Sequence, residues 1–85
     1  MKHSSGATIS AYSWRGKPSG IRVMISYDNG NTWDIDHIIY ETDAGWDLGY
    51  PSTIELSGGS LLTVFYARTG EDELAVIMQQ KWRIQ

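Results

Sequence analysis

Cysteine is absent from this chain of 85 residues, and several other features are scarce. Without cysteine no disulfide can support the fold, and nothing in the composition points to an oxidising compartment. No apolar run approaches the length that spans a bilayer, and the first residues lack the apolar segment of a secretion signal. We therefore expect no membrane partner, and a cytoplasmic location if this is the full native chain.

Clustered positive charge is also missing. The seven Lys and Arg residues are scattered and outnumbered by ten Asp and Glu residues, which gives a formal net charge of -3. Proteins that bind nucleic acids gather basic side chains on one face, so we expect no nucleic-acid partner. His3 and His37 are isolated and the chain has no metal-ligand spacing, so we expect no metal and no other cofactor.

Aromatic residues are plentiful by contrast, with four tryptophans and five tyrosines. This density is typical of an all-β core or of a carbohydrate-facing surface. No segment has a helical period with capping residues. Turn residues instead separate six runs of β-forming residues, which predict strands over residues 7–14, 20–26, 34–41, 50–56, 61–68 and 74–84. Residues 1–6 are predicted to be a flexible tail, and residues 7–85 a single domain.

Residues 26–33 form the most informative stretch, a Ser-x-Asp-x-Gly-x-Thr-Trp pattern between two predicted strands. The carboxylate of Asp28 can accept hydrogen bonds from backbone N–H groups inside a turn, and Gly30 tolerates a positive φ. The hydroxyls of Ser26 and Thr32 can bond backbone groups that the turn leaves unpaired. Trp33 is predicted to anchor the turn on a hydrophobic core.

This pattern resembles the Asp-box, or bacterial neuraminidase (BNR) repeat, of sialidase-like β-propellers. All fixed positions of the motif are matched. In that family the box is a structural clasp that joins the third and fourth strands of a blade. The resemblance therefore implies a fold more strongly than it implies an activity.

An internal repeat supports the same hypothesis. With a shift of 53 residues, residues 9–15 fall on residues 62–68 and residues 21–25 fall on residues 74–78 without a gap. Apolar positions match apolar positions, and Arg15 matches Arg68. A period of about 50 residues built only of strands is the size of a propeller blade.

Labelling the strands of a blade A to D from the inside outward, residues 7–41 then correspond to strands B, C and D of one blade. Residues 50–84 correspond to strands A, B and C of the next. The expected fold is all-β, with antiparallel sheets that form about two incomplete blades of a six-bladed propeller, the C-terminal blades only. Such a piece leaves apolar faces and sheet edges uncovered, so we expect a homo-oligomer, either a dimer or a trimer.

The resemblance also suggests candidate catalytic residues. Residues 47–56 and 59–66 resemble the C-terminal blade of the family, where a tyrosine at the head of strand A is the nucleophile of true sialidases. The resemblance implies that Tyr50 is that nucleophile, and the loop carboxylate of Asp47 is a candidate general acid or base. A phenol has a reference pKa near 10 and needs an adjacent base to attack an anomeric carbon. Tyr50 as a packed strand-entry residue and Asp47 as a turn cap are the structural alternatives.

Three further residues are candidates for ligand binding because the blade topology brings them to the same end as Tyr50. Arg15 and Arg68 are cations that could meet a substrate carboxylate, and Trp46 could stack on a sugar ring. Each has a structural alternative: the two arginines recur at equivalent blade positions, and Trp46 could anchor its loop.

Three hypotheses for function follow. The first is a non-catalytic, self-associating module that binds a glycan at this end. The second is an exo-sialidase-like glycoside hydrolase whose site is completed across subunits, and the third is a purely structural or assembly protein. A sialidase needs a cluster of three arginines for the substrate carboxylate, and in the family most of it comes from blades that this chain lacks. We therefore favour the non-catalytic hypotheses.

Overall fold

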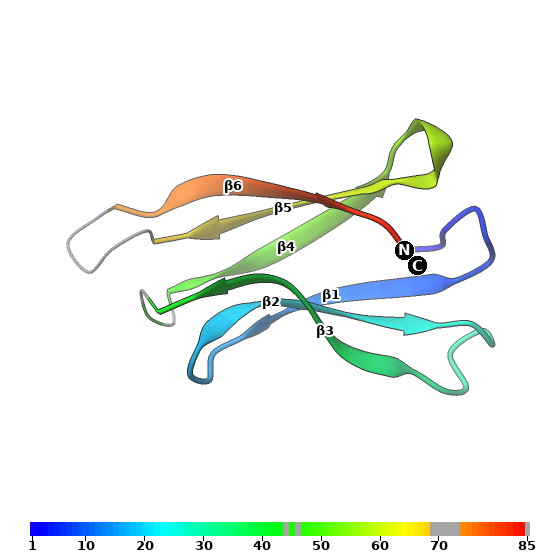
Figure 1. Ribbon diagram of the computed structural model, residues 1–85, viewed down its shortest axis with the longest axis horizontal. Helices are drawn as coiled ribbons and strands as arrows, with labels where there is room; N and C mark the ends of the chain where they lie inside the picture. Colours follow the sequence, from blue (N-terminus) through cyan, green and yellow to red (C-terminus); the bar gives the residue numbers. More distant parts are fainter. Residues whose placement is uncertain (44, 46, 69–73, 85) are drawn as a thin grey trace.

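The computed structural model describes residues 1–43, 45, 47–68 and 74–84 and folds them into two antiparallel sheets of three strands each (Figure 1). The first sheet has the order β1-β2-β3 and the second the order β4-β5-β6. The strands are β1 (Thr8–Trp14), β2 (Ser19–Ser26), β3 (Asp34–Thr42), β4 (Leu48–Glu55), β5 (Leu61–Ala67) and β6 (Val76–Trp82). The all-β prediction is confirmed at this level.

The predicted strands are all present, with shifts at their ends. β4 begins at Leu48, two residues before the prediction, and β6 is shorter than the predicted segment. A short 3₁₀ turn, η1 (Ser57–Gly59), joins β4 to β5 where a tight turn was predicted. Each sheet is an up-and-down meander because each connection is too short for a crossover.

The two sheets pack face to face, with β1 against β4 and β3 beside β6 (Figure 1). Side chains alternate along a strand, so the buried positions of each strand point into the space between the sheets. Two clusters of buried residues fill this space: Ala7, Ile9, Ile25 and Leu61 form one, and Ile21, Leu48, Phe65 and Ala67 form the other.

Polar side chains inside the second sheet bond to one another. Thr63 is fully buried, and its hydroxyl lies 2.8 Å from that of Thr53 on the neighbouring strand. The indole N–H of Trp82 donates to the same Thr63 oxygen at 2.9 Å. This chain of hydrogen bonds joins all three strands and offsets the cost of burying the hydroxyls.

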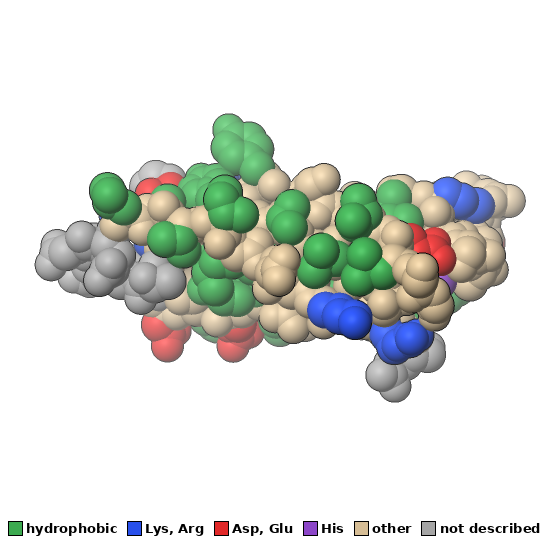
Figure 2. Space-filling view, turned by 90° about the horizontal axis from the view of Figure 1, so that it is seen from above, with side chains coloured by type: hydrophobic (Ala, Val, Ile, Leu, Met, Phe, Trp, Pro, Cys, Tyr) green, Lys and Arg blue, Asp and Glu red, His purple; other side chains and the backbone are tan. Residues whose placement is uncertain are grey.

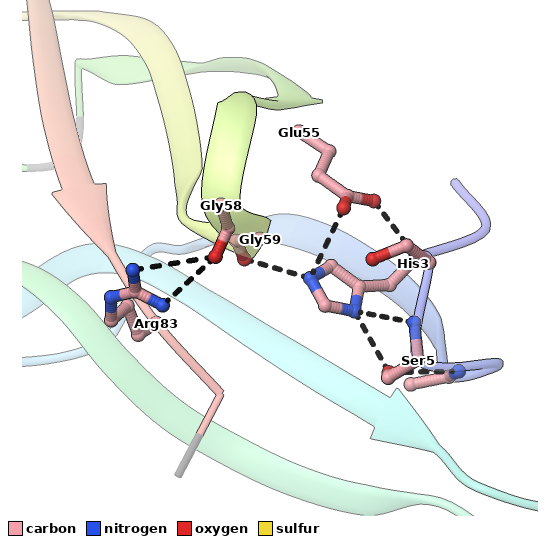
Figure 3. A network of polar contacts seen from close by, with 8 residues as sticks. His3, Ser5, Glu55, Gly58, Gly59 and Arg83 are labelled. Carbon is pink, nitrogen blue, oxygen red and sulfur yellow. Dashed lines mark hydrogen bonds and ion pairs between the residues drawn. The ribbon is translucent and has the colours of Figure 1, made fainter.

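The amino-terminal segment differs from the predicted flexible tail, because it folds back on β1 and on η1. Lys2 forms an isolated bridge with Thr8, and the N–H of Ile9 donates to the carbonyl of Met1 at 2.8 Å. His3 is only 8% exposed, and its Nε2 lies 2.8 Å from the carbonyl of Gly59 (Figure 3). Residues 1–6 therefore cover part of the free edge of β1.

The turns gather at two ends of the molecule. The turn between β2 and β3 lies at the same end as η1 and the two termini (Figure 1). The turn between β1 and β2 lies at the opposite end, together with the start of β4. Residues 15–19 lie near residues 42, 43 and 45 at this second end.

Candidate functional site

The turn at residues 26–33, which carries the Ser-x-Asp-x-Gly-x-Thr-Trp pattern, closes on its own side chains. The Ser26 hydroxyl donates to Oδ1 of Asp28 at 2.8 Å and accepts from the N–H of Gly30 at 2.7 Å. The carboxylate of Asp28 also accepts from the N–H and the hydroxyl of Thr32, at 2.8 and 2.6 Å. The hydrogen bonds from Thr32, followed by that from Ser26, lower the pKa of Asp28 to about 2.

The turn backbone explains the glycine of the pattern. Asn29 and Gly30 have φ angles of 59° and 90°, a region that asparagine and glycine enter more readily than other residues. Trp33 lies beside Gly30 and is half-buried, while the two core clusters are built from other residues. In this structure Trp33 covers its own turn, which differs from the core anchor that we predicted.

Three of the sequence-predicted site residues meet at the start of β4. Arg15 donates from Nη2 to the carbonyl of Leu48 at 3.0 Å. Nε of Arg68 lies 3.3 Å from Oδ2 of Asp47. Both arginines thus contact residues 47–48, at the start of β4. Trp46 lies outside the described residues.

Tyr50 lies on the outer face of the second sheet, which points away from β1–β3. Its side chain is 88% exposed, and its ring centroid is 5.7 Å from that of Tyr66. Its φ of 49° falls where the register between β4 and β5 shifts, which turns the ring outward. Val64 and Ile77 line the shallow hollow beside it, so its surroundings are apolar.

A cleft of about 300 Å³ lies at the same end of the molecule, between the β1–β2 turn and the β3–β4 loop. Its lining combines cations, a carboxylate, hydroxyls and backbone: Arg15, Gly16, Lys17, Pro18, Ser19, Thr42, Asp43 and Gly45. Tyr50 is not among these lining residues. Among the described residues, the cleft and Tyr50 therefore do not form one pocket.

Sequence reasoning missed a group of four side chains on the outer face of the first sheet. This group, the Trp14 cluster, consists of Tyr12, Trp14, Arg22 and Asp36. The Tyr12 hydroxyl donates to Oδ1 of Asp36 at 2.6 Å, and Nη1 of Arg22 lies 3.4 Å from the same oxygen. Cζ of Arg22 lies 4.1 Å from the centroid of the Trp14 ring.

The electrostatics of the Trp14 cluster follow from these contacts. The hydrogen bond from Tyr12, aided by Arg22, lowers the pKa of Asp36. Burial and the hydrogen bond to Asp36 raise the pKa of Tyr12. The sequence feature that could have indicated this cluster is the alternation along residues 7–14 and 20–26. It places Tyr12, Trp14 and Arg22 on one face of the sheet.

Comparison of the chain with protein-family models, with curated proteins and with solved structures finds no match. The described residues contain no group of three or more metal-ligating side chains placed to hold an ion. They also contain no helix long and apolar enough to cross a bilayer.

Proposed function

We propose that the chain is a non-catalytic module related to the Asp-box propellers, and that it assembles as a homodimer through the outer face of β4–β6. The single observation that carries this proposal is the apolar character of that face. The closed hydrogen-bond set of the Asp-box turn and the repeat of 53 residues support the relation to propeller blades.

The residues of this face follow from the register of the strands. Leu61, Thr63 and Phe65 are buried inward, so the alternate positions of β5 and their partners on β4 and β6 point outward. The outward side chains are Tyr50, Ser52, Ile54, Leu62, Val64, Tyr66, Ile77, Gln79 and Lys81. Hydrophobic side chains run along most of the length of this face (Figure 2).

The exposure of these side chains is large for a monomer. Tyr50 is 88% exposed and Ile77 is 80% exposed, and both line one hollow with Val64 and Tyr66. Contiguous apolar patches of more than a few hundred Å² mark interaction surfaces on soluble proteins. Burying apolar surface against a partner is favourable in proportion to the area removed from water.

A second copy of the chain fits this face better than a charged partner would. Lys81 is the charged residue among the outward positions, and it stands at one end of the set. A two-fold axis pairs a surface with itself, so a nearly uncharged face meets no like-charge repulsion. A standard protein–protein interface buries about 800 Å² on each partner. This is a modest share of the accessible surface of one chain, which is 5438 Å².

A glycan at the cleft is the second candidate function. The cleft brings Lys17, Ser19 and Asp43 to one hollow, and hydroxyl-rich ligands suit such a mixture of donors and acceptors. The hydrolase hypothesis has less support, because Tyr50 faces apolar neighbours and Asp47 pairs with Arg68. Incubation with a fluorogenic sialoside tests it: turnover that Tyr50→Phe abolishes would establish the hydrolase instead.

Light scattering coupled to gel filtration tests the dimer. We expect the mass of two chains for the native protein and of one chain for Ile77→Asp, because a buried unpaired charge opposes association.

Ile35→Asp is the matched control: Ile35 is 58% exposed but lies on β3 of the other sheet, so this variant should remain a dimer. Circular dichroism must show that each variant is folded, and Tyr50→Ser provides a second, milder change to the face. A folded native monomer at all concentrations would refute the proposal.

A further inference from the structure

We propose that the outer edge of β6 binds an extended acidic peptide, which adds a fourth strand to the second sheet beside β6. Peptides bound in this way gain affinity from backbone hydrogen bonds and specificity from pockets for alternate side chains. The added strand lies in the plane of the sheet, whereas the proposed dimer buries the outer face of the sheet. The inference therefore goes beyond the proposed dimer and does not depend on it.

The first support is the regular edge of β6. All seven residues of β6 pair with β5 without a register shift, from Trp82 opposite Leu61 to Val76 opposite Ala67. The strand contains no proline and no glycine. Every second residue of an antiparallel edge strand directs its N–H and C=O groups away from the sheet. In the part of the chain that the structure describes, no strand pairs with these groups of β6.

The other edges of the two sheets are less suited to a new strand. Residues 1–6 cover part of the edge of β1. β4 contains Pro51 and a register shift, and it packs against β1. β3 has register shifts against β2 and a φ of 64° at Asp36. Natural sheets blunt their edges with prolines, bulges and covering segments, so β6 is the edge that stays open to pairing.

The second support is a hollow of about 290 Å³ between β3 and the carboxyl end of β6. Its apolar lining comes from Val23, Ile25, Ile39, Trp82 and Ile84. The Trp82 side chain is fixed there, because its indole N–H donates to the Thr63 hydroxyl at 2.9 Å. A strand added to β6 directs every second side chain toward the inner face of the sheet. An apolar side chain at the position beside Trp82 would fill the hollow.

The charges at this end of β6 select an acidic peptide. Lys81 and Arg83 are both exposed, and the Arg83 guanidinium donates to the Gly58 carbonyl at 3.3 and 3.4 Å (Figure 3). The carboxylate that lines the hollow, Asp34, lies 2.9 Å from Nε2 of His37. A lysine on an edge strand opposes pairing with a second copy. Acidic side chains opposite Lys81 and Arg83 would instead form favourable cross-strand pairs.

A fluorescently labelled peptide tests the site, with the sequence fluorescein-Gly-Gly-Glu-Phe-Glu-Val-Thr-Val-Thr-amide. Antiparallel pairing gives the stronger ladder, and it sets the glutamates opposite Arg83 and Lys81 and the phenylalanine opposite Trp82. We expect saturable binding by fluorescence anisotropy, weakened about tenfold or more when both glutamates are replaced by lysine. Replacement of the phenylalanine by alanine should also weaken binding, because the hollow then stays unfilled.

Two N-methylated forms of the peptide separate strand pairing from simple apolar contact. One form is methylated at the amides of the phenylalanine and the valines, and the other at the amides of the glutamates and threonines. An edge strand pairs through every second residue, so one form should lose binding and the other should retain most of it. Hydrogen exchange followed by NMR should slow at alternate amides of β6 when the native peptide is bound.

Protein variants locate the peptide on the molecule. Lys81→Glu should weaken binding about tenfold or more, because it reverses the charge opposite a glutamate. Lys17→Glu makes the same change at an exposed lysine in the β1–β2 turn, at the opposite end of the molecule, and should have little effect. Tyr50→Ser, which changes the dimer face, should bind the peptide as the native protein does, so failure of the dimer leaves this test intact.

Four results would overturn the proposal. One is the absence of saturable binding of the acidic peptide, and another is binding that the two N-methylated forms change equally. The third is binding that Lys17→Glu abolishes while Lys81→Glu leaves it intact, which would place the peptide in the cleft. The fourth is exchange at alternate β6 amides that slows with rising protein concentration in the absence of peptide, which would show that a second copy occupies the edge.

Discussion

At the scale of single residues, Asp28 shows how one carboxylate holds a turn together. It accepts hydrogen bonds from the hydroxyls of Ser26 and Thr32 and from the backbone N–H of Thr32. All partners lie within four residues of Asp28, so the turn can form without help from the rest of the fold. Because these hydrogen bonds are local, the residues that make this turn can be recognised in the sequence.

The lowered pKa of Asp28 gives a prediction with a definite pH window. Its pKa of about 2 in the folded protein lies below the ordinary aspartate pKa of 3.8, so its contribution to stability is present above about pH 4. That contribution is lost as the pH falls through 2. We expect Asp28→Ala to lower the melting temperature at pH 7, and the difference from the native protein to shrink between pH 4 and pH 2.

Thermal unfolding followed by circular dichroism from pH 7 to pH 2 measures this difference. Glu41→Ala is the matched control, because Glu41 is an exposed carboxylate on β3 and surface changes of this kind usually have little effect. A melting-temperature difference for Asp28→Ala that stays constant across the whole pH range would contradict the assignment.

At the scale of elements, the segment that precedes β1 acts as a short extra strand. The bridge from Lys2 to Thr8 covers the edge of β1, and His3 fastens the segment to η1. The N–H of Ser4 donates to Oε1 of Glu55 at 2.8 Å, which adds a contact with β4. The two sheets are thus linked at this end as well as through their cores.

Removal of the His3 side chain should loosen this link. His3→Ala loses the bond to the Gly59 carbonyl and the contact with Ser5, and a lost buried hydrogen bond costs about 1–3 kcal/mol. We expect a lower melting temperature and faster hydrogen exchange at the amides of residues 3 and 9. Ser4→Ala keeps the backbone hydrogen bond to Glu55 and should behave like the native protein. Unchanged hydrogen exchange at these amides in His3→Ala would show that His3 does not hold the amino-terminal segment in place.

At the scale of the whole molecule, two three-stranded sheets enclose a small core and leave one broad apolar face outside it. The molecule measures 42 × 26 × 18 Å, and a chain of this size buries a limited share of its surface when it folds alone. A partner on the outer face of β4–β6 would add to that burial. Stability and association are therefore linked in the proposed dimer.

This linkage predicts a melting temperature that depends on protein concentration. If the dimer is the folded species, each tenfold rise in concentration stabilises it by roughly 1.4 kcal/mol. Scanning calorimetry over a hundredfold range of concentration should show a steady rise in melting temperature for the native protein. The rise should be absent for Ile77→Asp, and an equal rise in that variant would argue against this face as the interface.

The amino-acid sequence by itself determined the local features of this protein. The alternation of apolar residues in segments such as 20–26 gave the strands, and hydrogen bonds that span four residues gave the turn at Asp28. The residues that make these features interact with residues close to them in the chain, so the features can be predicted without knowing which distant residues they meet. The same locality explains why the order of the strands within each sheet follows the order in the chain.

Only the tertiary structure decided how distant residues meet. It set β1 against β4, turned the Arg15 side chain to the Leu48 carbonyl, and aimed Tyr50 away from the core. It also assembled the Trp14 cluster, because the hydrogen bond from Tyr12 to Asp36 depends on a register shift between β2 and β3. Such shifts arise from the balance of packing across the whole sheet, and a one-residue slip reverses which face a side chain occupies.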